Sequence, residues 1–230
     1  MPDRTVLDNP IWPAISGPQA HLAERISSAG RFHPDVAPFC AIADDPEAWP
    51  DLARLVGPGQ RALLFSAGVE VGDGWTVDHS FRCLQFVAND LKPRKGLELV
   101  DLTPDDVPDM IALVEATMPG PFGPRTIEMG RYFGHELDGR LVAMAGERVR
   151  LPGYAEVSAV CTVDEFRGRG LGGELTLAVA EHIRSRGDEA FLHVRFDNTN
   201  AIRLYESLGF TVRRDDVDVI ILTSPAEKIR

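Results

Sequence analysis

The stretch from Arg167 to Gly173 has the composition of an anion-binding turn, with the residues Arg167, Gly168, Arg169, Gly170, Leu171, Gly172 and Gly173 in that order. Residues 156–163 before it are rich in β-branched side chains and predict a strand, and residues 171–183 after it have the apolar spacing of an amphipathic helix. Glycine allows the backbone to approach a ligand closely, and the free N–H groups of a first helical turn carry a partial positive charge. We therefore expect this turn to bind a phosphate or pyrophosphate.

The same glycines also satisfy a dinucleotide-binding fingerprint, Gly168-x-Gly170-x-x-Gly173, with Asp197 as a candidate ribose-binding acid. Three features argue against that interpretation. Four residues separate the strand from the first glycine, and too few residues follow the motif to complete a doubly wound sheet. The two strands before the motif are joined by a short Pro152-Gly153 turn. A short turn predicts antiparallel strands, which a nicotinamide-binding fold does not place there.

A second motif lies downstream, at a fixed distance from the first. It runs Asn198, Thr199, Asn200, Ala201, Ile202, Arg203, Leu204, Tyr205, Glu206, Ser207, Leu208, Gly209, Phe210. Together with the glycine turn, this segment resembles the signatures of the GNAT N-acetyltransferases. The resemblance covers residues 97 to 223, and residues 131 to 173 are most similar to the branch related to glycine N-acyltransferases.

The resemblance implies an α/β (α+β type) fold, in which a mixed, mostly antiparallel sheet with splayed central strands is flanked by helices. The predicted elements agree with the GNAT order of strand, helix, three antiparallel strands, helix, strand, helix, strand. We expect strands at 97–102, 132–137, 140–149, 156–163, 190–195, 210–214 and 217–223, with helices from Thr103, from Leu171 and over 201–208.

The resemblance also implies acetyl-CoA as acyl donor and assigns its contacts. Backbone groups of Val160, Cys161, Thr162 and Val163 would hydrogen-bond the pantetheine arm, and residues Arg167 to Gly173 would hold the pyrophosphate. Asn198 would either bond to the arm or cap the following helix. Tyr205 occupies the position of the family's general acid, since a phenol of pKa ~10 is protonated at neutral pH. The alternative is that Tyr205 only packs between helix and sheet.

Candidates for the base and for acceptor binding are less defined by the sequence. Glu156 shares a strand face with Val160 and is either a catalytic base or a carboxylate paired with an arginine; Glu147 and His193 are weaker candidates. Other members of the family remove the amine proton through water. Phe122 and Arg125 lie in a Pro/Gly-rich segment expected to border the acceptor site, or merely to end a helix. No metal site is expected.

Residues 92–96 read as a linker that divides the chain into an N-terminal half, 1–95, and a GNAT N-acetyltransferase domain, 96–230. In the first half we expect helices at 18–28 and 46–56 and strands at 39–43, 61–66 and 80–87. This half carries no chemical motif. It is either a degenerate GNAT-like copy of the second half or an accessory domain that shapes the acceptor pocket.

The net charge of the chain bears on which macromolecules it can bind. The 230 residues carry a net charge of −11, which argues against nucleic-acid and anionic-membrane partners. There is no signal peptide or long apolar run, so we expect a cytoplasmic protein, monomeric or homodimeric, with Cys40, Cys83 and Cys161 as free thiols.

Two functions remain open from the sequence. The first is transfer of an acetyl group from acetyl-CoA to a primary amine of a small molecule or amino acid, by direct attack in a ternary complex. The second is a non-catalytic acetyl-CoA-binding module, which needs the glycine turn but has no need of an acid at Tyr205.

Overall fold

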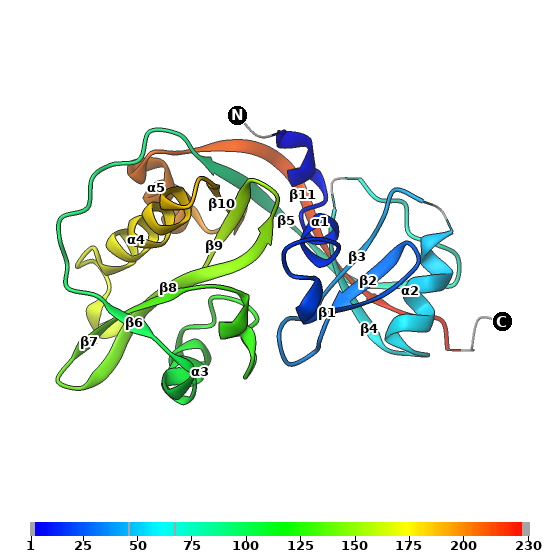
Figure 1. Ribbon diagram of the computed structural model, residues 1–230, viewed down its shortest axis with the longest axis horizontal. Helices are drawn as coiled ribbons and strands as arrows, with labels where there is room; N and C mark the ends of the chain where they lie inside the picture. The colour runs from blue at the N-terminus through cyan, green and yellow to red at the C-terminus, as the bar shows by residue number, and fades with distance from the viewer. Residues whose placement is uncertain (1–2, 46, 67, 227–230) are drawn as a thin grey trace.

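The computed structural model describes residues 3–45, 47–66 and 68–226. In this part of the chain eleven strands form one sheet in the order β1-β2-β3-β4-β11-β5-β10-β9-β8-β7-β6 (Figure 1). Neighbours are antiparallel except β3 with β4 and β9 with β10, which confirms the expected mixed, mostly antiparallel sheet. The strands are β1 (Ala23–Ile26), β2 (Ala29–Phe32), β3 (Phe39–Ile42), β4 (Arg61–Ser66), β5 (Thr76–Ala88), β6 (Val100–Leu102), β7 (Tyr132–Leu137), β8 (Arg140–Leu151), β9 (Tyr154–Thr162), β10 (Glu189–Arg195) and β11 (Phe210–Thr223).

Helices flank this sheet. Those of the described residues are α1 (Ile11–Ile15), α2 (Ala48–Val56), α3 (Val107–Thr117), α4 (Leu171–Ser185) and α5 (Thr199–Leu208), with short 3-10 turns at Arg4–Asp8, Ala20–Leu22, Pro104–Asp106, Thr126–Met129 and Asp164–Phe166. In the described part of the chain, no helix has both the length and the apolar character that crossing a membrane requires.

The central part of the second half follows its sequence pattern closely. A capping box between Thr103 and Asp106 begins the turn that leads into α3, and acidic residues fall near the positive end of that helix. In α4 the side chains of Leu175, Val179 and Ile183 are fully buried, at the spacing of one helix face. These apolar faces pack on β8, β9 and β10 and form the core of the second half.

Three expectations differ from the structure. The predicted helix at 18–28 is wrong: this segment holds a 3-10 turn followed by β1 and the Ser27–Ser28 turn into β2, in which Ser27 has φ +44°. The predicted strands 210–214 and 217–223 are one strand, β11, whose register with β5 shifts between Val212 and Val217 and again between Ile221 and Leu222. Of the expected strand 97–102 only Val100–Leu102 is paired, with β7.

The two halves of the chain share strands. β5 belongs to the first half, yet it pairs with β10 on one side and β11 on the other. β11 in turn pairs with β4 of the first half. Figure 1 shows β5 and β11 running from one part of the molecule to the other. The predicted boundary near residue 95 therefore divides the chain but not the sheet.

Candidate functional site

A gap in the sheet opens between β9 and β10. These parallel strands pair only through Tyr154, Ala155 and Glu156 of β9, although β9 continues to Thr162 and β10 to Arg195. The rest of β10 pairs with β5. Within the free part of β9, Ala159 has φ +51° and the register with β8 shifts, so the strand carries a bulge. The splay expected from the resemblance is therefore present.

The glycine turn lies at one end of this gap. Gly168 has φ +78° and Gly170 has φ +84°, conformations that glycine adopts without strain. Gly170 precedes the first residue of α4, Leu171, and the first-turn N–H groups of a helix have no intrahelical acceptor. A Cβ built on Gly168 or Gly170 meets nothing within 4 Å, so the turn borders open space. This geometry suits a bound pyrophosphate.

The two arginines of the turn are exposed and locally paired. Arg167 forms an ion pair with Asp164 at 2.9 Å and donates from Nε to the carbonyl of Thr162. The guanidinium of Arg169 lies over the ring of Phe166, 4.6 Å from its centroid. Both side chains therefore lie near the start of α4 and are exposed to solvent.

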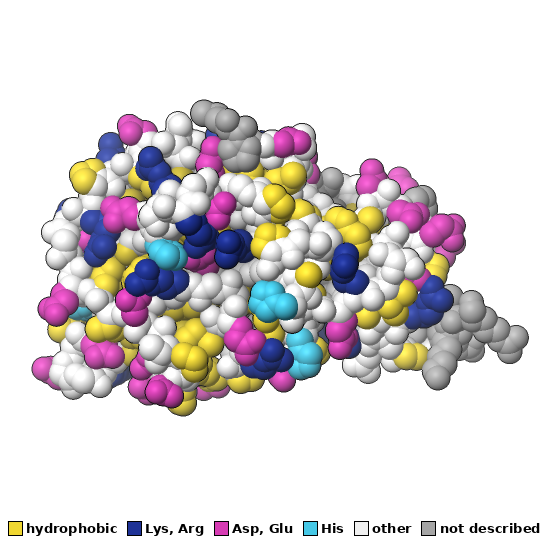
Figure 2. Space-filling model, viewed as in Figure 1, with side chains coloured by type: hydrophobic (Ala, Val, Ile, Leu, Met, Phe, Trp, Pro, Cys, Tyr) yellow, Lys and Arg dark blue, Asp and Glu magenta, His cyan; other side chains and the backbone are white. Residues whose placement is uncertain are grey.

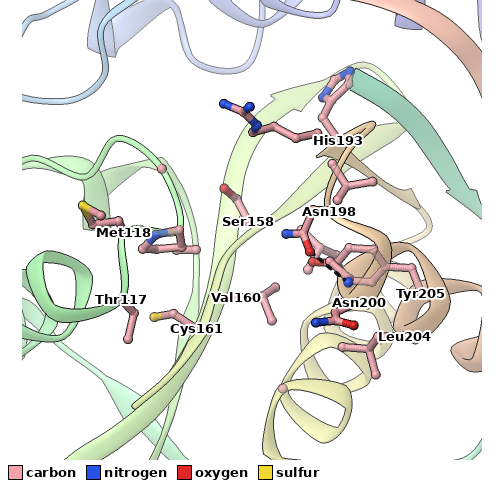
Figure 3. A pocket seen from close by; sticks show the side chains of 18 of the residues that line it. Thr117, Met118, Ser158, Val160, Cys161, His193, Asn198, Asn200, Leu204 and Tyr205 are labelled. Carbon is pink, nitrogen blue, oxygen red and sulfur yellow. Dashed lines mark hydrogen bonds between the residues drawn. The ribbon is translucent and has the colours of Figure 1, made fainter. Parts of the chain in front are cut away.

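One cavity of about 1070 Å³ runs from the glycine turn through the gap toward the N-terminal half. Figure 3 shows Val160 and Ser158 of β9 between Thr117 and Met118 on one side and Tyr205, Leu204 and Asn198 on the other, with His193 at the far end. Of the expected cofactor-binding residues, those that line the cavity are Val160, Cys161, Thr162, Arg167, Gly168, Gly170, Leu171, Gly172, Gly173, Asn198 and Tyr205. Val163 and Arg169 flank this lining without forming part of it.

Tyr205 lies on α5 with its ring near those of Phe86 and Phe210. Its hydroxyl makes no hydrogen bond to a described residue, and burial raises the pKa of Tyr205 to about 12. The phenol therefore keeps its proton throughout the neutral range, as a general acid must before it donates. Packing and an acid role are compatible, because the ring is buried while the residue lines the cavity.

Asn198 is the N-cap of α5. Its Oδ1 accepts a hydrogen bond from the Ala201 backbone N–H at 3.1 Å. The capping alternative is therefore what the structure shows, and the residue lines the cavity from that position.

Glu156 is buried and fully engaged. Its carboxylate accepts hydrogen bonds from Nε and Nη2 of Arg148 at 2.8 and 2.7 Å, and from Nδ1 of His193 at 2.8 Å. Burial would raise the pKa of Glu156, but the Arg148 charge and the hydrogen bonds from both partners outweigh it and lower the pKa to about 2. Because Glu156 is 1 % exposed and outside the cavity lining, this geometry favours the ion-paired alternative over a general base.

The two weaker base candidates are also occupied. Glu147 is buried in a bidentate pair with Arg186, close to His182 and away from the cavity. His193 lines the cavity, but its second ring nitrogen lies 3.0 Å from the Gln85 amide nitrogen. Neither residue presents a free acceptor for an amine proton.

The expected acceptor contacts Phe122 and Arg125 lie outside the cavity lining. Phe122 packs edge-on against the buried ring of Tyr132, and Arg125 pairs with Glu128 through two hydrogen bonds of 2.7 Å. The same segment does border the cavity, but through residues 118–121. An acceptor role for Phe122 and Arg125 thus stays a prediction that the lining of this cavity does not support.

The residues that sequence reasoning missed come mainly from the first half. Phe39, Leu63, Phe65, Phe81 and Cys83 line the far end of the cavity on β3, β4 and β5. In the sequence they are ordinary apolar positions of predicted strands, and nothing local distinguishes a cavity wall from a core.

The splayed sheet, the glycine turn at a helix start and the tyrosine beside the gap are the features of the acyltransferase fold that the sequence resemblance implies. Residues 134–219 match the family model described as FR47-like protein. A solved GNAT-family acetyltransferase from Novosphingobium aromaticivorans is 39 % identical, covers 95 % of this chain and 98 % of its own, and superposes with a TM-score of 0.85. The chain therefore belongs to the GNAT family of acetyltransferases.

Curated relatives match over shorter segments. Mycothiol acetyltransferase from Thermobispora bispora is 56 % identical over 66 residues, 28 % of this chain and 22 % of the relative. The enzyme of that name from Thermomonospora curvata is 43 % identical over 91 residues, 39 % of this chain and 30 % of the relative. The match thus spans less than a third of either relative's length.

Proposed function

We propose that this protein transfers the acetyl group of acetyl-CoA to the primary amine of a small molecule or amino acid, by direct attack in a ternary complex. The observation that carries the proposal is one continuous cavity that holds the glycine turn, the free edge of β9 and Tyr205 together. The relatives' common name, mycothiol acetyltransferase, supports a small-molecule acceptor.

Different segments that line the cavity would bind different parts of acetyl-CoA. The N–H groups at the start of α4 and the turn from Arg167 to Gly170 would hold the pyrophosphate, and the unpaired edge of β9 around Val160 would hydrogen-bond the pantetheine arm. Bound there, acetyl-CoA supplies the activated thioester carbonyl. A β9 backbone N–H in the gap would stabilise the carbonyl oxygen as negative charge develops on it.

The reaction requires one proton to reach the thiolate and one to leave the amine. Tyr205 holds its proton on Oη at neutral pH and donates it to the departing thiolate. Glu156 acts as a positioning residue for Arg148 and His193 and does not accept the proton. The amine proton leaves through water in the cavity.

Calorimetric titration with acetyl-CoA, using NADH as a control ligand, tests the donor site. Saturable binding of acetyl-CoA alone is the expected result, and binding of NADH alone would refute the donor assignment.

A tyrosine variant separates catalysis from binding alone. Tyr205→Phe should bind acetyl-CoA normally and lose roughly 100-fold in kcat, measured by thiol release, because the proton donor is gone. Tyr132→Phe is the matched control: this tyrosine is buried, its hydroxyl makes no hydrogen bond within the described part of the chain, and it does not line the cavity. Its kcat should not change. Acetyl-CoA binding without turnover of any amine by the unaltered protein would favour the non-catalytic module.

A further inference from the structure

The cavity differs in charge from the rest of the molecule. The chain carries a net charge of −11, and Figure 2 shows acidic and basic side chains interspersed over the visible face. Among the described residues that line the cavity there is no Asp or Glu, whereas Arg148, Arg167 and Arg195 all line it. A ligand with several positive charges finds no countercharge there.

Arg148 lies at the end of the cavity away from the glycine turn. Its Nε and Nη2 both donate to Glu156, and its guanidinium lies over the rings of Phe39 and Phe65, 4.8 and 5.7 Å from their centroids. Its Nη1 makes no hydrogen bond to a described residue, and the side chain is 12 % exposed while the residue lines the cavity. One edge of a rigidly held guanidinium is therefore available to a ligand.

The walls around this guanidinium are apolar and come from the first half of the chain and β11. Phe39, Leu63, Phe65 and Phe81 lie on β3, β4 and β5, and Val219 lies on β11. A site with apolar walls and one fixed charged donor selects ligands that combine an apolar group with a carboxylate.

We propose that the acceptor is a free amino acid with a bulky apolar side chain, a specificity that rests on the function proposed above. Its carboxylate is bound by Arg148, and its side chain lies against Phe39, Phe65 and Phe81. Its amine nitrogen forms a bond to the acetyl carbon as the carbon–sulfur bond breaks; the nitrogen loses a proton to water and the sulfur takes one up. The N-terminal half thus supplies the acceptor's specificity.

Three ligands isolate the features that this proposal requires. L-Phenylalanine has both the ring and the carboxylate, phenethylamine lacks only the carboxylate, and spermidine is a polycation. Each is titrated by calorimetry into the 230-residue protein saturated with CoA, and each is tested as an acceptor by thiol release from acetyl-CoA. We expect L-phenylalanine to bind roughly 10- to 100-fold more tightly than phenethylamine, because it gains a hydrogen bond between charged groups. Spermidine should not bind in the cavity.

An arginine variant tests the residue itself. Arg148→Lys keeps a positive charge beside Glu156 but loses the planar fork, so affinity for L-phenylalanine should fall roughly tenfold while that for phenethylamine stays the same. The matched control is Arg131→Lys, since Arg131 also makes a bidentate pair, with Asp101, and lies over a phenylalanine ring, Phe133, but does not line the cavity. It should leave both affinities unchanged.

A second variant addresses the apolar wall without touching the ion pair. Phe81→Ala should weaken L-phenylalanine binding and leave L-alanine binding unchanged. Equal affinity for L-phenylalanine and phenethylamine, or a preference for spermidine, would overturn the proposed acceptor while leaving the acetyltransferase function standing. Failure to bind acetyl-CoA at all is a separate result, which would refute the function and this specificity together.

Discussion

At the scale of single residues, two buried ionisable groups, Tyr205 and Glu156, have pKa values shifted in opposite directions. Tyr205 has no charged partner, so burial raises its pKa to about 12 and keeps it protonated. Glu156 is as deeply buried, but Arg148 and His193 compensate the burial and the pKa falls to about 2. At neutral pH Tyr205 is therefore neutral and Glu156 is ionised.

The ionised carboxylate makes stability depend on pH. Because the folded-state pKa of Glu156, about 2, lies below the ordinary 4.5, its contribution is fully present above pH 4.5 and is lost as the pH falls toward 2. Glu156→Gln should lower the free energy of unfolding at neutral pH by about 3 kcal/mol, since it leaves Arg148 without its countercharge. Urea unfolding across this pH range should show the deficit shrinking below pH 4.5. A constant deficit would contradict the assignment.

The glycine turn offers a direct test of anion binding. Gly170→Asp places a carboxylate where the pyrophosphate is expected, and should weaken acetyl-CoA binding at least roughly 100-fold through like-charge repulsion. Gly187→Asp is the control, because Gly187 also has a positive φ, +90°, and an open Cβ position, but lies after α4 and outside the cavity lining. Calorimetry should show unchanged affinity for this second variant. Equal loss in both would indicate a folding effect.

At the scale of elements, the sequence is most informative where local rules and tertiary structure agree. The strand before the glycine turn and the helix after it each have one dominant periodicity, and α5 begins with an Asn cap and ends at Gly209 in the left-handed conformation. These segments carry most of the proposed donor site, and their positions in the fold could be predicted from the sequence.

Where the prediction fails, the cause lies outside the local sequence. Residues 18–28 have the composition of a short helix, but Ser27 adopts φ +44° and directs the chain back into a hairpin whose second strand pairs with β3. Likewise Phe39, Phe65 and Phe81 reach the cavity only through strand pairing between distant segments. Contacts of that kind leave no periodic signal near the residues that make them.

One element contact fixes the linker between the halves. The carboxylate of Glu174, in the first turn of α4, accepts hydrogen bonds from the backbone N–H groups of Lys95, Gly96 and Leu97. Glu174→Ala should lower the free energy of unfolding by about 2 kcal/mol, because three donors lose their acceptor. Glu181→Ala, on the exposed side of the same helix and 3.9 Å from Arg94, should change it by less than about 1 kcal/mol. Chemical denaturation distinguishes the two; equal effects would contradict this role for Glu174.

At the scale of the whole molecule, the two halves depend on each other because strands of one half pair with strands of the other. The second half closes its sheet with β5 of the first half, and the first half extends its sheet with β11 of the second. Between them lies an apolar core to which both contribute, including Phe39, Phe65, Tyr154 and Phe191. The end of the cavity away from the glycine turn lies at the same junction, so the shape of the cavity depends on the assembly of the full sheet.

Removal of the first half and cleavage of the linker should therefore have different effects on folding. The fragment 96–230 lacks β5, which leaves the facing edges of β10 and β11 unpaired and their buried side chains exposed, so it should fail to fold. A chain cleaved at an inserted protease site between Pro93 and Arg94 retains every strand. It should stay assembled on gel filtration, bind acetyl-CoA with unchanged affinity and unfold in a single transition. A folded, acetyl-CoA-binding 96–230 fragment would show instead that β5 is dispensable and that the second half is an independent domain.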